Sequence, residues 1–151
     1  MRKFVILILF IFISLPCIAN DVLYLNEKWD NAASKILYEH ELRELNVTPE
    51  KAHELFGFKQ SDVRAVFYDL NADGVNEVIG YVDTRYYYGV LGWSLFILRK
   101  NNNSYVNISS INFYPEKGLH IFKNKLINGY YELGFYEDLN RNFKKLKYNN
   151  N

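Results

Sequence analysis

The stretch FYDLNADGVNEVIGYV, residues 67–82, decides the fold expected for this chain. The residues leading into its polar centre alternate, and Val63, Ala65 and Phe67 fall on one side, as in a half-buried strand. The residues after the polar centre, EVIGYV, are rich in β-branched and aromatic side chains and predict a second strand. We therefore expect a strand, a polar loop and a neighbouring strand of the same sheet.

Further strands follow this unit. The segments WSLFILRK (residues 93–100), YVNISSINF (105–113) and HIFKNKLINGYYELGFYE (120–137) have strand composition. Turn signals separate them at NNNS (101–104), at Lys123-Asn124 and at Asn128-Gly129. The strands come in a run and do not alternate with helices, which favours an antiparallel sheet.

Two helices are expected before the strands. The first helix is expected at residues 30–45. Together with the preceding Trp29, its residues Ala33, Ile36, Leu37 and His40 form one stripe at helical spacing, with Glu, Lys and Arg on the other face. In TPEKAHELFG (48–57), the first residue suits an N-cap, the proline suits the first helical position and the glycine suits the C-terminal cap. The prediction is an α+β fold in which two N-terminal helices pack on an antiparallel sheet of about five strands.

The N-terminus has the features of a secretory signal peptide. Arg2 and Lys3 precede an apolar run, and Pro16 and small residues precede a cleavage site after Ala19. The run is shorter than the roughly 18–20 apolar residues of a membrane span, so we expect no stable membrane insertion after cleavage. Two alternatives stay open: an uncleaved anchor, and lipid modification of Cys17. The leading interpretation is a signal peptide at 1–19, one domain at 20–151, and a periplasmic or secreted protein.

Composition excludes several classes of protein. The only cysteine lies in the leader, so no disulfide framework is expected, and 49% hydrophobic residues supply an ordinary core instead. The net charge is +1 and falls to −1 without the two leader cations, so no nucleic-acid partner is expected. No zinc-protease, nucleophile-elbow or phosphate-loop motif is present. We interpret His40, His53 and His120 as surface or boundary residues.

The polar centre, DLNADGVNE, spaces its oxygen-bearing side chains as a calcium loop does. Calcium takes six to eight oxygen ligands at about 2.3–2.6 Å. The expected ligands are the side chains at positions 1, 3, 5 and 9 and the backbone carbonyl at position 7, namely Asp69, Asn71, Asp73, Glu77 and Val75. Position 12 is Gly80 and strands flank the loop, so it is not an EF-hand. The alternative is a polar turn whose side chains bind their own backbone.

This strand–loop–strand pattern resembles the calcium loops of FG-GAP or VCBS-type repeats. It is similar, over residues 63–135, to exported bacterial domains in which a DLNGDGxxE loop precedes a glycine-rich turn of the form CGxGGC. The resemblance implies a small non-enzymatic exported domain with a structural Ca²⁺ and a disulfide. This chain has Tyr88 and Trp93 where the cysteine pair would stand, while Gly89 and Gly92 remain.

The aromatic turn after the second strand is the expected contact surface. It contains Arg85, Tyr86, Tyr87, Tyr88 and Trp93, and aromatics with polar tips favour binding surfaces. The alternative is that alternate tyrosines enter the core. The function that we expect is an exported binding domain without enzymatic activity, for example an inhibitor or immunity protein, whose partner is an unknown protein or envelope glycan. The alternative is a calcium-dependent hydrolase acting on envelope glycans or lipids.

Overall fold

The computed structural model describes residues 20–89, 92–109, 111–137 and 142–146, so the expected signal peptide and Cys17 lie outside the described residues. The helices are α1 (Asn31–Glu44) and α2 (Pro49–Phe56), with single 3₁₀ turns at Gln60–Asp62 and Pro115–Lys117. The strands are β1 (Asp21–Leu23), β2 (Val63–Tyr68), β3 (Glu77–Val82), β4 (Tyr88–Gly89), β5 (Gly92–Asn101), β6 (Ser104–Asn107), β7 (Ile111–Phe113), β8 (Leu119–Ile127), β9 (Tyr130–Tyr136) and β10 (Phe143–Leu146).

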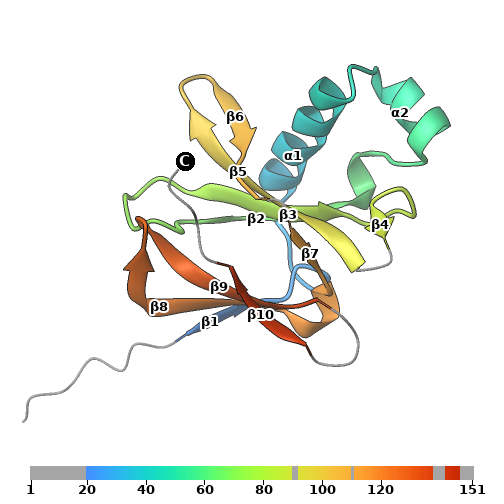
Figure 1. Ribbon diagram of the computed structural model, residues 1–151. Helices are drawn as coiled ribbons and strands as arrows, with labels where there is room; N and C mark the ends of the chain where they lie inside the picture. Colours follow the sequence, from blue (N-terminus) through green and yellow to red (C-terminus); the bar gives the residue numbers. More distant parts are fainter. Residues whose placement is uncertain (1–19, 90–91, 110, 138–141, 147–151) are drawn as a thin grey trace, which may run out of the picture.

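The fold is α+β, as predicted, but the described strands form two antiparallel sheets and not one. The larger sheet has six strands in the order β2-β3-β5-β4, with β6 and β7 also paired to β5. The smaller has four strands in the order β1-β8-β9-β10. Helix α1 lies over one side of the larger sheet and the smaller sheet lies below the other side (Figure 1). The described chain is therefore arranged in three layers.

The central position of the larger sheet explains the apolar composition of β3. All six residues of β3 are buried, because each face of this strand meets a different layer. Val78 and Val82 pack in the core beneath the helices. Ile79 and Tyr81 pack in the core between the two sheets. The expected side for Val63 and Ala65 is confirmed, since both belong to the core beneath the helices.

The predicted caps of α2 are confirmed, and α1 has a cap that was not predicted. Asp30 caps α1 by accepting hydrogen bonds on Oδ1 from the backbone N–H groups of Ala32 and Ala33, at 2.7 and 2.9 Å. Thr48 caps α2, and Gly57 ends it in the left-handed conformation with φ of 69°.

The face of α1 that packs on the sheet was predicted less well. Ser34, Tyr38 and Glu41 are buried alongside the expected apolar stripe. The prediction that acidic residues occupy only the exposed face is wrong for Glu41, which is 5% exposed. His40 is 3% exposed, so its interpretation as a surface or boundary residue is also wrong.

The smaller sheet adds two features that the sequence did not reveal. Strand β1, directly after residue 20, pairs with the start of β8. The expected turn at Lys123-Asn124 does not form. In the described structure, β8 continues through these residues with a shift of register between Phe122 and Leu126. The turn at Asn128-Gly129 is confirmed, with φ of 54° and 84°.

Candidate functional site

The loop between β2 and β3 carries the five expected calcium ligands. Its side chains fold inward onto the loop backbone: Asp69 Oδ2 accepts a hydrogen bond from Gly74 N at 2.9 Å, and Asp73 Oδ1 accepts one from Val75 N at 2.7 Å. Asn71 Oδ1 accepts one from Asp73 N at 3.0 Å. These bonds hold the side-chain oxygens inside the turn. They are also the bonds that a polar turn without a metal would make.

The backbone of the loop is bent sharply at two positions. Ala72 and Gly74 have φ of 59° and 82°. The glycine adopts this conformation without a Cβ penalty, whereas alanine adopts it at a cost of order 1 kcal/mol. The inward side-chain bonds to the N–H groups offset that cost. Glycine is the usual residue at such a bend, whereas the alanine at position 72 gives no sequence signal of its positive φ.

Glu77 is the innermost ligand candidate and is 2% exposed. Its Oε2 accepts a hydrogen bond from Leu70 N at 2.9 Å, while its Oε1 lies 3.5 Å from Asn71 Nδ2. Burial raises the pKa of the Glu77 carboxyl, the Leu70 bond lowers it, and the charges of Asp73 and Asp69 raise it further. The amide of Asn71 also donates to Asp73 Oδ2 at 2.8 Å, so its NH₂ group lies between two carboxylates.

The chemistry of this donor set suits a hard cation, although the side chains are not drawn together around one point. Among the described residues, no group of three or more His, Cys, Asp or Glu is close enough to hold a metal ion. The Asn71 NH₂ supplies only a partial positive charge to the carboxylates beside it. A bound Ca²⁺ would supply two full positive charges, with oxygen ligands from the residues that the sequence predicts.

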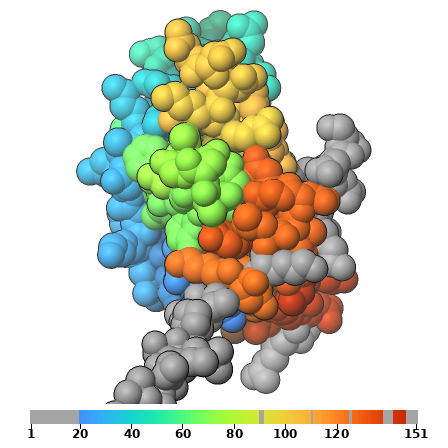
Figure 2. Space-filling model, turned by 90° about the vertical axis from the view of Figure 1, so that its left-hand side faces the viewer, coloured from blue at the N-terminus to red at the C-terminus, as the bar shows by residue number. Residues whose placement is uncertain are grey.

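The base of the loop is tied to the second sheet. Leu70 is fully buried between the sheets, and its carbonyl accepts a hydrogen bond from Tyr131 N of β9 at 2.7 Å. Figure 2 shows the green surface of the loop beside the orange surface of the β8–β9 region. Because Glu77 holds the N–H of the same Leu70, the loop links the carboxylate cluster to the contact between the two sheets. A cation at the loop would therefore stabilise more than the hairpin.

The aromatic turn does not form one surface. Arg85, Tyr88 and Trp93 line one cavity, whereas Tyr86 and Tyr87 line another. Tyr86 and Tyr88 are 53% and 45% exposed, but Tyr87 is 9% exposed and belongs to the core beneath the helices. The turn thus combines the two interpretations that the sequence left open, with Tyr87 inside and its neighbours outside.

The cavity at Trp93 has a volume of about 530 Å³. Its wall also includes Asp62, Asp83 and Thr84. The ring of Trp93 lies 4.5 Å from that of Tyr88, centroid to centroid. Trp93 Nε1 and Thr84 Oγ1 are both buried without a hydrogen-bond partner among the described residues. The cavity therefore combines aromatic faces, carboxylates and a guanidinium group, which is a mixture suited to a hydroxyl-rich ligand.

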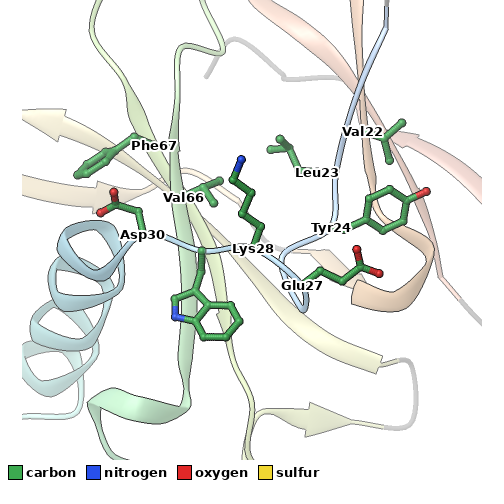
Figure 3. A pocket seen from close by; sticks show the side chains of 9 residues that line it. Val22, Leu23, Tyr24, Glu27, Lys28, Asp30, Val66 and Phe67 are labelled. Atoms are coloured by element: carbon green, nitrogen blue, oxygen red, sulfur yellow. The ribbon is translucent and has the colours of Figure 1, made fainter.

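A third cavity, of about 540 Å³, lies between β1, the segment after it and β2. Figure 3 shows Leu23 and Val66 beside Lys28 in this region, with Tyr24 and Glu27 on the other side of the segment. At its edge the guanidinium of Arg64 lies 4.1 Å from the centre of the Trp29 ring. Nearby, Tyr68 of β2 and Lys123 of β8 both bind Asp21, at 2.5 and 2.7 Å, and the Tyr68 bond fastens β1 to the larger sheet.

Sequence reasoning missed the burial of Glu41, and it placed His40 on the apolar stripe without assigning it a partner. Tyr87 Oη donates a hydrogen bond of 2.6 Å to Glu41 Oε2 inside the protein, and His40 Nε2 lies 3.9 Å from Glu41 Oε1. The position of His40 on the apolar stripe of α1 was the available signal. Glu41 gave none, because its partner Tyr87 is 46 residues away.

Comparisons of the chain with protein-family models, with curated proteins and with solved structures found no match. The resemblance to FG-GAP or VCBS-type calcium loops accordingly stays a prediction. Among the described residues, no helix is long and apolar enough to cross a membrane.

Proposed function

We propose that this protein is an exported, non-enzymatic binding domain that takes an envelope glycan in the cavity at Trp93. The observation that carries the proposal is the meeting of Trp93, Tyr88 and Arg85 with two carboxylates in one cavity. Sugar rings pack their C–H faces on aromatic rings, and their hydroxyls pair with carboxylates and guanidinium groups. The expected location is the periplasm or the exterior of the cell.

The proposal includes a structural role for Ca²⁺ in the β2–β3 loop. The loop lies at the surface while its inner ligand, Glu77, reaches the core between the sheets. Calcium outside the cytoplasm is commonly millimolar, so even a weak site of this kind would be filled. The ion would stabilise the domain and would not need to contact the glycan. FG-GAP or VCBS-type loops are the proposed relatives of this segment.

The alternative, a calcium-dependent hydrolase, is favoured by one observation, the presence of both Asp62 and Asp83 in the cavity at Trp93. Glycosidases use such pairs of carboxylates. However, Asp62 Oδ2 accepts a hydrogen bond from Lys59 N at 2.9 Å and Oδ1 lies 3.4 Å from Ser61 Oγ. This carboxylate caps a 3₁₀ turn, and an engaged cap is poorly placed to transfer a proton. We therefore favour binding without turnover.

The test is cosedimentation of the exported protein with purified peptidoglycan, in CaCl₂ and in EDTA. The chain has only two tryptophans, which provides a matched control. Trp93→Ala should reduce binding strongly, and Trp29→Ala, in a different cavity, should leave it unchanged. Equal binding by the two variants would contradict the proposed site. Release of soluble fragments that is lost in Asp83→Asn would support the hydrolase.

A further inference from the structure

A polar hollow lies between the C-terminal half of α1 and the larger sheet, away from the cavity at Trp93. It consists of two adjoining cavities of about 350 and 460 Å³, which share Glu41, Phe96 and Asn107 in their walls. Three tyrosines also contribute to the walls: Tyr86, Tyr87 and Tyr105. The proposed glycan site does not use this hollow.

Glu41 is the buried acid of the hollow, and its hydrogen-bonding capacity is mostly unused. A carboxylate accepts about four hydrogen bonds, and the bond from Tyr87 Oη to Oε2, at 2.6 Å, is a single one. Burial raises the pKa of this carboxyl, the Tyr87 bond lowers it, and the charge of Glu44 raises it further. No cation is among these causes. His40 Nε2 lies 3.9 Å from Oε1, beyond hydrogen-bond distance, so Oε1 can accept a hydrogen bond from a ligand.

His40 contributes an uncharged ring to the same wall. It is 3% exposed and lines the cavity that it shares with Glu41 and Glu44. Burial lowers the pKa of the imidazole, which favours the neutral ring, while the charge of Glu44 and the Tyr105 backbone raise it. Its Nδ1 has no hydrogen-bond partner among the described residues. Because Nδ1 is shielded from solvent, the ring forms part of the wall and Glu41 is the group that faces a ligand.

The hollow has negative charge without a positive counterpart. The titratable groups in its walls are Glu41, Glu44, His40 and the three tyrosines, and no lysine or arginine is among the lining residues. Arg43 is close enough for its charge to act on His40, but it is exposed and does not line the hollow. The last turn of α1, which ends at Glu44, adds the partial negative charge of a helix C-terminus.

We propose that this hollow binds the guanidinium group of an arginine side chain presented by a protein partner. A guanidinium has five N–H donors in one plane, so it can donate to Glu41 Oε1 while its flat face lies against a ring in the wall, which a compact ammonium group does less well. Its flat face can stack on a tyrosine, and Tyr86 is exposed at the rim. Glu41 and Glu44 have no cationic residue beside them in the walls, so the hollow favours a positively charged side chain of the partner.

The experiment is a titration of the ¹⁵N-labelled exported protein with N-acetyl-arginine amide, followed by NMR. N-acetyl-citrulline amide has the same shape without the charge and is the matched control. The arginine probe should shift the amide signals of Tyr86, Tyr87 and Asn107, and the citrulline probe should not. Equal shifts with the two probes, or shifts confined to the cavity at Trp93, would overturn the proposal.

Two variants show whether Glu41 is the group that binds. Glu41→Gln keeps an oxygen for Tyr87 Oη but removes the charge, and it should weaken the arginine probe about tenfold or more. Glu39→Gln, on the exposed face of α1 where Glu39 lies 3.8 Å from Lys35, should leave probe binding unchanged. Unchanged binding to Glu41→Gln would disprove the assignment. Tyr86→Ala, at an exposed position, should weaken binding without loss of folding.

Free L-arginine distinguishes a protein partner from a small-molecule ligand. The hollow offers no cation for an α-carboxylate, so the free amino acid should bind no more tightly than the blocked probe. Tighter binding of the free amino acid would overturn the assignment to a protein partner. Peptidoglycan binding by Trp93 does not enter this experiment, so the two proposals fail independently.

Discussion

Among the residues that the structure describes, two glutamates are buried, and they differ in their hydrogen-bond partners. Glu77, at the start of β3, is 2% exposed and accepts a backbone hydrogen bond from Leu70, with an amide and two further carboxylates close by. Glu41, in α1, is 5% exposed and accepts one hydrogen bond, from Tyr87. Burial raises the pKa of both carboxyls. The Glu77 side chain thus binds a backbone N–H of its own loop, whereas Glu41 has a carboxylate oxygen without a hydrogen bond, beside a hollow.

The difference teaches that a buried acid can serve either the fold or a ligand, and that its partners show which. The N–H group bound by Glu77 would lose its partner if the side chain were removed. The acceptor left over on Glu41 gains a partner only from outside the described chain. Substitutions, calcium and pH should therefore act differently on the two glutamates.

The largest expected effect is that of Glu77→Ala measured in EDTA. The substitution leaves the buried N–H of Leu70 without an acceptor and should lower the free energy of unfolding by about 3 kcal/mol. Urea denaturation followed by circular dichroism measures the loss. Asn76→Ala, at the exposed neighbouring position, is the control and should change stability by under about 0.5 kcal/mol. Equal effects of the two substitutions would remove the structural role of Glu77.

Calcium should stabilise the folded protein through the loop that contains Glu77, and this stabilisation should not depend on Glu41. At about 100 times its Kd, a ligand bound only by the folded state adds about 2.7 kcal/mol, which raises the unfolding midpoint by several degrees. Thermal unfolding in EDTA, CaCl₂ and MgCl₂ measures the rise. Asp73→Ala should abolish the calcium response and Glu41→Gln should retain it. Full retention of the response by Asp73→Ala would refute the ligand assignment.

The two glutamine variants should differ by about 1–2 kcal/mol in stability. In Glu77→Gln, one side-chain oxygen still accepts from Leu70 N, but the new NH₂ replaces the acceptor that faces Asn71 Nδ2, so the protein is destabilised. In Glu41→Gln, the acceptor for Tyr87 is kept and a buried charge is removed, so stability is unchanged or increased. Chemical denaturation at neutral pH compares them, and a reversed order would contradict the roles assigned here.

The smallest effect should appear in the pH dependence of stability. Both carboxyls have folded-state pKa values above the ordinary 4.5, so the folded protein holds these protons more tightly than the unfolded chain does. Their contribution is fully present below pH 4.5 and is lost as pH rises through the raised pKa values. In EDTA, Glu41→Gln should therefore reduce the fall in stability above pH 4.5. An unchanged slope would show that Glu41 carries its charge without cost.

Local patterns accounted for much of the fold. The caps at Thr48 and Gly57, the strands around the DLNADGVNE loop and the turn at Asn128-Gly129 all depend on residues close together in the sequence. Predictions failed where packing across the fold overrode a local pattern. The expected turn at Lys123-Asn124 became part of β8, because pairing with β9 resumes at Leu126 after a bulge. The continuous apolar residues of β3 were recognised as a strand, but the second sheet that covers them was not foreseen.

The sequence by itself determined the α+β class, the ends of α2 and the inward-folded polar loop, because each depends on short-range sterics and hydrogen bonds between near neighbours. Only the tertiary structure decided that the strands divide into two sheets, that the aromatic turn faces two cavities, and that Glu41 meets Tyr87 and His40 beside a hollow. Those contacts join segments tens of residues apart. Their geometry depends on how whole layers pack to bury apolar surface, which no local pattern encodes.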